Sequence, residues 1–218
     1  MKQCQFIIFV LALISMSCIN VYVSSAPVES RTMSFEGSPQ AISVSQGVDV
    51  VVDATLAPNE AVVTTHNDLI DYVKVYVEDN TLNIGVDAPR PISTERLEVR
   101  IPRFAYNALS LSGGADFSDS GYCGEQLTIA ASGGADVEID GAVQMLTASA
   151  SGGADLSLDE LCAACVVVEA SGGADVDVYA TESLVANASG GADVSYKGNP
   201  AKVEANSSSG ASIERDND

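Results

Sequence analysis

Through the C-terminal half of the chain, apolar and polar residues alternate on both sides of a repeated pair of glycines. In one copy Leu127 and Ile129 precede the glycines, and Val137 and Ile139 follow them. An alternation with a period of two predicts strands with one buried face. The two glycines predict a turn, because glycine adopts positive φ without steric cost. Each unit is therefore expected to be two strands joined at a tight turn.

The unit recurs as the pentapeptide Ser-Gly-Gly-Ala-Asp, at spacings of 20, 19, 20 and 18 residues. The copies begin at Ser112, Ser132, Ser151, Ser171 and Ser189. A degraded sixth copy occupies residues 208–212. The predicted turn positions are Gly113, Gly114, Gly133, Gly134, Gly152, Gly153, Gly172, Gly173, Gly190 and Gly191.

A unit of this size cannot bury its own apolar face, but copies stacked on one another can. Neighbouring copies would pair as parallel strands about 4.8 Å apart. The sequence thus predicts an all-β protein, a parallel β-solenoid with about six regular coils of 18–20 residues over 108–213. The more variable second turn of each unit predicts one tight edge and one looser edge.

The preceding part, 33–107, is β-rich without a regular repeat. Residues 42–51 look like a worn copy of the same coil. Residues 72–77 and 81–86 flank Glu-Asp-Asn and predict a hairpin. Residues 96–101 predict a further strand that ends at a proline.

The termini are expected to lie outside the fold. Lys2 precedes an apolar run over 6–16, which is typical of a secretory signal and short for a membrane span. We expect a signal peptide over 1–25 and no transmembrane span after its removal; the alternative is a lipoprotein signal with a lipid anchor at Cys18. Residues 26–32 are expected to be a linker and 214–218 a disordered tail.

Three cysteines follow the expected signal. One histidine and three cysteines with this spacing do not make a four-ligand zinc site. Cys162 and Cys165 are expected to be buried thiols or a local disulfide. Counting from the aspartates places Cys123 and Cys162 in one column, two coils apart with Val143 between them, which is too far for a disulfide. Cys123 is therefore expected to be a free or buried thiol.

The net charge of −20 is unevenly distributed. Between Phe104 and Tyr196 there are fourteen Asp and Glu residues and no Lys, Arg or His. Such a surface repels phosphate backbones, so nucleic-acid binding is not expected. Two interpretations of this acidic surface are open. It keeps the protein soluble, or it binds cations or a basic partner.

The repeated aspartates form the most regular polar column. Its members are Asp116, Asp136, Asp155, Asp175 and Asp193. Stacked carboxylates repel by about 0.9 kcal/mol per neighbour even in bulk water. Two arrangements offset this repulsion: each Asp caps its own turn by accepting backbone N–H groups, or the coils share cations such as calcium. Calcium takes six to eight oxygen ligands, and a single file offers few. Apart from calcium, no cofactor is expected.

In several segments of its sequence the chain resembles the auto-transporter adhesin family with a head GIN domain, a family of exported bacterial proteins. The resemblance covers about 33–213 and rests on four segments, which are 42–50, 82–84, 97–99 and 109–116. It implies a right-handed β-helix, pectin-lyase-like in shape, without a matching catalytic set, and a role in adhesion. Many relatives carry Gly-Ser-Gly or Gly-Ala-Gly where this chain has Gly-Gly.

Catalysis has little support in the sequence. The lone histidine, His66, lies in a polar segment that is typical of a surface loop. The basic residues that a polysaccharide lyase would need are absent from the repeats, since the cluster Arg90, Arg96, Arg100 and Arg103 precedes them. We therefore expect a non-enzymatic protein of the periplasm, outer membrane surface or extracellular space, acting in adhesion or interaction with an unidentified protein or glycan. The alternatives are a carbohydrate-binding or carbohydrate-active β-helix and a purely structural envelope module.

Overall fold

The computed structural model describes residues 22–94 and 96–216. The expected lipid anchor at Cys18 and most of the expected signal peptide lie outside these residues. The strands are β1 (Tyr22–Val23), β2 (Val28–Ser34), β3 (Ala41–Ser45), β4 (Asp49–Asp53), β5 (Glu60–His66), β6 (Val73–Glu78), β7 (Thr81–Val86), β8 (Ile92–Ser93), β9 (Leu97–Pro102), β10 (Ala108–Ser112), β11 (Asp116–Gly133), β12 (Asp136–Gly152), β13 (Asp155–Gly172), β14 (Asp175–Ser189), β15 (Asp193–Lys197), β16 (Lys202–Ser207) and β17 (Ser212–Arg215). One short 3-10 helix, η1 (Ile70–Tyr72), lies between β5 and β6.

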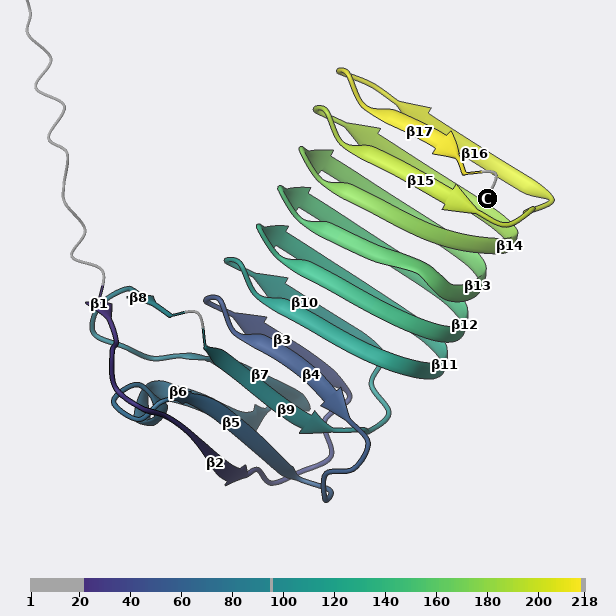
Figure 1. Ribbon diagram of the computed structural model, residues 1–218. Helices are drawn as coiled ribbons and strands as arrows, with labels where there is room; N and C mark the ends of the chain where they lie inside the picture. The colour runs from purple at the N-terminus through teal and green to yellow at the C-terminus, as the bar shows by residue number, and fades with distance from the viewer. Residues whose placement is uncertain (1–21, 95, 217–218) are drawn as a thin grey trace, which may run out of the picture.

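The repeats form a parallel β-solenoid, as the alternation predicts. It makes about 5 turns, and the degraded sixth copy adds a last rung from the separate strands β16 and β17. Figure 1 shows the coils stacked like rungs, from β3 and β4 to β17. Equivalent repeat residues pair in register, for example Ser132 with Ser151 and Asp136 with Asp155.

The two edges of the solenoid differ more than the sequence indicates. At one edge the chain reverses at the Gly-Gly turns. At the other edge it bends without interruption, so β11 to β13 are single strands of 17 or 18 residues. Bulges interrupt the pairing at this bent edge, between Asp119 and Tyr122 and again between Glu138 and Gly141. The bulges absorb the variation in repeat length without disturbing the turn edge.

Alternate side chains point into the stack and form one continuous core. Leu127, Ile129, Val137 and Ile139 are at most 2% exposed, as their alternation predicts. Burial of each such side chain contributes about 1.5–3 kcal/mol. The outward residues form two flat faces. We call the face with β9, β4, the first halves of β11–β14, β15 and β17 the acidic face. The opposite face, built from β7, β3, β10, the second halves of β11–β14 and β16, is the serine face.

The N-terminal region extends the same columns in a different chain order. The segment 42–51 is indeed a coil, since β3 pairs with β10 and β4 with β11 in parallel. The later strands β7 and β9 then add in parallel on the far side of β3 and β4. Counted from the N-terminal end of the stack, the chain forms the second rung, β3 and β4, before the first rung, β7 and β9. The loop from β9 to β10 then leads past the second rung to the third.

Antiparallel strands complete this end of the stack. The expected hairpin is confirmed as β6 and β7, with Tyr76 opposite Asn83. On the acidic face β5 pairs antiparallel with β9, and β2 pairs antiparallel with β5. The expected linker 26–32 thus lies mostly in β2, because its residues pair with an edge that is far away in sequence. Likewise, Glu214 and Arg215 of the expected tail belong to β17.

Candidate functional site

Seven carboxylates follow one column of the acidic face, next to the Gly-Gly turns. Strand pairing places Asp49 beside Asp116 and Glu98 beside Asp49. The column consists of Glu98, Asp49, Asp116, Asp136, Asp155, Asp175 and Asp193, and we call it the acidic ladder. Ser212 takes the next place on β17. Sequence reasoning found the five repeat aspartates and missed Asp49 and Glu98. Asp49 was detectable, because it follows Gly47 by the spacing of the repeat turns.

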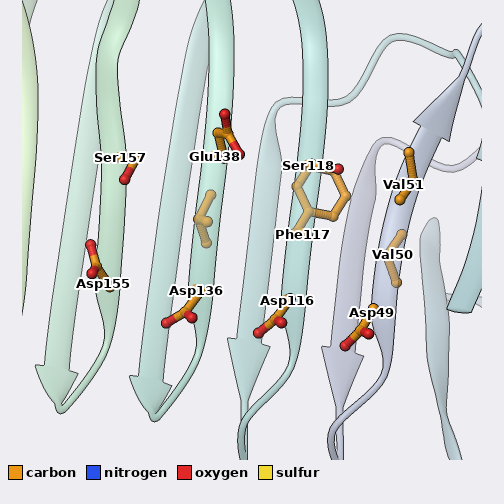
Figure 2. A pocket seen from close by; sticks show the side chains of 11 residues that line it. Asp49, Val50, Val51, Asp116, Phe117, Ser118, Asp136, Glu138, Asp155 and Ser157 are labelled. Atoms are coloured by element: carbon orange, nitrogen blue, oxygen red, sulfur yellow. The ribbon is translucent and has the colours of Figure 1, made fainter. Parts of the chain in front are cut away.

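The centre of the ladder borders a shallow groove of about 280 Å³. Figure 2 shows Asp49, Asp116, Asp136 and Asp155 in one row beside the turns, with Glu138 farther along its strand. Along that neighbouring column Glu138 pairs with Ser118 and Ser157. The groove therefore offers carboxylates and hydroxyl groups, which suits positively charged or hydrogen-bond-donating ligands.

Partial burial and, after it, mutual repulsion raise the pKa of three members of the ladder. Partial burial, reinforced by Glu98, raises the pKa of Asp49 above its ordinary value. Partial burial also raises the pKa of Asp116, with Asp49 and Asp136 adding to the effect. The pKa of Asp155 is raised in the same way, by burial and then by its neighbours Asp136 and Asp175. Asp49, Asp116 and Asp155 therefore bind protons more readily than isolated carboxylates do, and a cation near them would relieve the repulsive part of the effect.

The turns are closed by the backbone, and the expected capping by aspartate side chains is not part of this arrangement. The backbone N–H groups of the repeat aspartates bond to the preceding coil, as from Asp155 to the carbonyl of Ala135 at 3.0 Å. The residues themselves are exposed at the start of each rung. The backbone N–H groups of the turn already have partners in the preceding coil. The aspartate carboxylates therefore remain available on the acidic face to bind a ligand.

Among the described residues, no group of three or more His, Cys, Asp and Glu side chains is placed to hold a metal ion. The ladder members stand in single file, one on each rung. Calcium sharing between coils stays a prediction.

The ten glycines occupy the turns as expected, and in the three middle turns the two glycine positions differ in φ. The first glycine of each pair has positive φ, for example +78° at Gly152. A Cβ at Gly152 would lie 3.1 Å from backbone atoms of Gly133, whereas one at Gly153 would make an ordinary contact at 3.5 Å. The first glycine thus permits the close approach of successive turns, while the parallel pairing holds the ladder in register.

The three described cysteines are free thiols, with Cys123 and Cys162 exposed and Cys165 half-buried. Ala142, rather than the expected Val143, separates Cys123 from Cys162 in their column. The reason is the pair of bulges at the bent edge, which shift the count by one residue. Oxidation of Cys162 and Cys165 to a local disulfide stays a prediction.

Residues 38–200 match the family described as "putative auto-transporter adhesin, head GIN domain". The chain belongs to this family. Solved structures share the fold. A "putative adhesin" from Bacteroides fragilis matches with a TM-score of 0.72 at 18% identity, covering 89% of this chain and 100% of the other. A "putative adhesin" from Parabacteroides distasonis gives 0.54 at 17% identity, covering 89% and 99%.

A "putative lipid binding protein" from Parabacteroides distasonis also matches, with a TM-score of 0.51 at 17% identity, covering 89% and 99% of the two chains. At these identities the likeness concerns the fold alone. No curated protein matches the chain. In the described part of this head GIN domain, no helix is long and apolar enough to cross a membrane.

A buried polar network ties the first repeat coil of the GIN domain to its N-terminal region. The Asp119 side chain is 1% exposed and accepts a hydrogen bond from Arg103 at 2.7 Å. Tyr106 donates to its other oxygen at 2.8 Å, and Tyr122 donates to the Tyr106 carbonyl at 2.8 Å. Burial and the Asp119 charge raise the pKa of Tyr122 to about 12 and that of Tyr106 further. Arg103 and Tyr122 also donate to backbone carbonyls, so the polar atoms of this network find their partners within the fold and join its two regions.

Proposed function

We propose that this protein is an exported, non-catalytic adhesion module that binds a positively charged partner along its acidic face. The observation that carries the proposal is the acidic ladder itself. Its carboxylates follow one another at the spacing of the rungs, and residues 105–195 contain no basic side chain to neutralise them. Membership of a family described as adhesins supports the adhesive role and the export.

Electrostatic attraction to such a face is long-ranged and depends on salt. Charged surfaces steer a partner of opposite sign, and the effect weakens as the Debye length falls to about 8 Å at physiological ionic strength. A rigid solenoid keeps its charges fixed before binding, so little entropy is lost on ordering them. The partner is therefore expected to present Lys or Arg side chains along an extended surface.

The test compares ladder variants with a charge-matched control. We expect Asp116→Asn/Asp136→Asn/Asp155→Asn to weaken binding to an immobilised lysine-rich peptide by about tenfold or more, since each lost contact is worth roughly 0.5 kcal/mol or more. The control neutralises three acids elsewhere, Glu125→Gln/Glu169→Gln/Glu182→Gln, and keeps the ladder. Binding that falls equally in both variants reflects net charge only and contradicts the proposal. Adhesion of the same variants to native cell envelopes extends the test from a synthetic peptide to natural partners.

A second function, carbohydrate binding, is favoured by one groove on the serine face. Tyr76 is 48% exposed there, in a groove of about 440 Å³ that also contains Lys74, Asn83 and Asp87. Gly85 lines the same groove opposite Lys74, and a Cβ at this position would lie 2.8 Å from the Ser45 hydroxyl, so a side chain there would crowd the groove. An exposed tyrosine ring with amide and charged groups around it suits the apolar face and hydroxyl groups of a sugar.

Glycan screening tests this second function. We expect Tyr76→Ala to abolish binding of any glycan captured by the wild-type protein, while Tyr72→Ala, which removes another exposed ring, leaves it unchanged. The same samples are checked for glycan cleavage. Turnover by the wild-type protein would contradict the non-catalytic proposal.

A further inference from the structure

The two ends of the solenoid close their cores differently. At the N-terminal end η1 packs against β5, and Leu69 and Ile70 at its start are only 3% and 0% exposed. At the C-terminal end the inward column of Leu184 continues to Val203, which is 44% exposed. Figure 1 shows β16 and β17 as the outermost rung at this end. The apolar column thus ends on a side chain that is nearly half exposed, with no further strand beyond it among residues 22–94 and 96–216.

The backbone of β16 is also open. Its six residues are all exposed, and it pairs with β14 along one edge. Its other edge has no strand partner within the described parts of the chain. An unpaired edge presents a row of N–H and C=O groups that another strand can extend.

The residues of this edge are self-complementary. The segment 201–205 reads Ala-Lys-Val-Glu-Ala. In an antiparallel pair of two such strands centred on Val203, Lys202 of each copy lies directly opposite Glu204 of the other. Neither Lys202 nor Glu204 makes an ion pair with the described residues of its own chain, so both charges are available.

The other basic residues near this end are already engaged. Lys197 bonds to Asp159 at 2.9 Å, and Arg215 donates to the carbonyl of Gly198 at 2.7 Å. The N-terminal edge strand β2 also carries opposite charges, at Glu29 and Arg31. There Arg31 already bonds to Asp71 at 2.5 Å, and the core behind it is closed.

We propose that two copies of this chain associate end to end through antiparallel pairing of β16 about Val203. The pairing extends the serine-face sheet from one copy into the other, and the two Val203 side chains cover each other. In an end-to-end contact only the ends of the two acidic faces lie near each other. The electrostatic repulsion between the two acidic molecules is therefore limited. The contact is one strand wide, below the size of a standard interface, so the dimer is expected to be weak.

Sedimentation velocity over a range of protein concentrations at about 0.15 M salt tests the proposal. We expect a reversible monomer–dimer equilibrium. Lys202→Glu and Glu204→Lys each place like charges opposite one another at two symmetric positions, and should weaken dimerisation by about tenfold. The double variant Lys202→Glu/Glu204→Lys restores the opposite charges and should return the wild-type affinity.

Matched controls separate this contact from net charge. Glu169→Lys changes the net charge as Glu204→Lys does, and Lys74→Glu changes it as Lys202→Glu does; neither should weaken dimerisation. A protein that stays monomeric at every concentration overturns the proposal. The proposal is also overturned if the single charge reversals leave the dimerisation affinity unchanged. It is overturned as well if the double variant does not return that affinity to the wild-type value.

A cross-link gives a second readout that does not depend on affinity. In a background without the other cysteines, Val203→Cys should form a disulfide-linked dimer on mild oxidation, because the two side chains face each other across the pair. Val185→Cys, one rung farther in, should remain monomeric. Circular dichroism confirms that each variant is folded. Cross-linking of both variants alike, or of neither, contradicts pairing about Val203.

Discussion

The repeat coils and the N-terminal region build the same columns from two kinds of sequence. In the repeats, one pentapeptide sets each turn, and equivalent residues fall into register automatically. In the N-terminal region Val99 occupies the column of Phe117 through Val50, although no repeated turn precedes Val99. The register of Val99 comes from pairing and burial alone. A side chain can thus enter a column of the solenoid in two ways. The repeated turn places it there, or strand pairing and burial do so without a repeated turn.

The difference predicts where each region is vulnerable. The repeats depend on a backbone conformation that only glycine adopts freely, and they can lose one carboxylate with little effect. The N-terminal region depends on buried side chains that lock its non-repeated strands to the first regular coil. Four substitutions or conditions test this contrast, in order of decreasing expected effect.

Asp119→Ala should have the largest effect, lowering the free energy of unfolding by about 3–5 kcal/mol. It removes the carboxylate that holds Arg103 and leaves the buried Tyr106 hydroxyl unpaired. Urea denaturation measures the change. The control, Asp136→Ala on the exposed ladder, should stay within about 0.5 kcal/mol of the wild type. Equal losses in the two variants would show that the buried network does not join the two regions.

Gly152→Ala should cost about 2–3 kcal/mol, because it combines positive φ with a close approach to Gly133. Gly153→Ala, at the next position in the same turn, should cost well under about 1 kcal/mol, since it has neither feature. Urea denaturation again gives both values. If the two substitutions prove equivalent, neither the positive φ of Gly152 nor its close approach to Gly133 contributes to stability.

Mild acidification should raise the thermal midpoint by a few degrees. Raised pKa values at Asp49, Asp116 and Asp155 mean that the folded state binds protons more tightly than the unfolded state. Their stabilising effect is therefore fully present below the unfolded pKa of about 3.9 and is lost as pH rises through the folded values. Stability should increase as pH falls from about 7 toward that window.

Two carboxylates oppose this trend at lower pH. Hydrogen bonds from Thr55 lower the pKa of Asp53, and those from Tyr22 and Ser24 lower that of Asp68. Their contribution is present above the unfolded pKa and is lost as pH falls through the folded values, so stability should decline again in stronger acid. The triple variant Asp116→Asn/Asp136→Asn/Asp155→Asn should show a smaller rise on mild acidification. If the thermal midpoint of the triple variant rises as much as that of the wild type, the ladder aspartates are not the source of the effect.

Calcium should have the smallest effect. Single-file carboxylates without further ligands offer a divalent cation mainly screening, so Ca²⁺ and Mg²⁺ at millimolar concentration should raise the midpoint of chelator-treated protein equally and by no more than a degree or two. Differential scanning calorimetry compares the two ions. A larger shift with Ca²⁺ alone, absent from the triple Asn variant, would establish a calcium site on the ladder.

The sequence by itself determined the repeat architecture of this protein. A period of two, interrupted by Gly-Gly every 18–20 residues, admits little other than stacked coils, because each unit can bury its apolar face only against a copy of itself. The same regularity identified the five repeat aspartates of the ladder, the turn glycines and, through the worn copy at 42–51, the first coil.

Only the tertiary structure decided the features that join distant segments. Pairing of β9 with β4 brought Glu98 into the ladder, and burial brought Arg103 to Asp119, although no local pattern marks either residue. Bulges at the bent edge moved Ala142 into the place expected for Val143. The open edge of β16 likewise follows from what the stack leaves uncovered. Alternation and turn residues act between near neighbours in the chain, whereas pairing across rungs is fixed by the burial of the whole core.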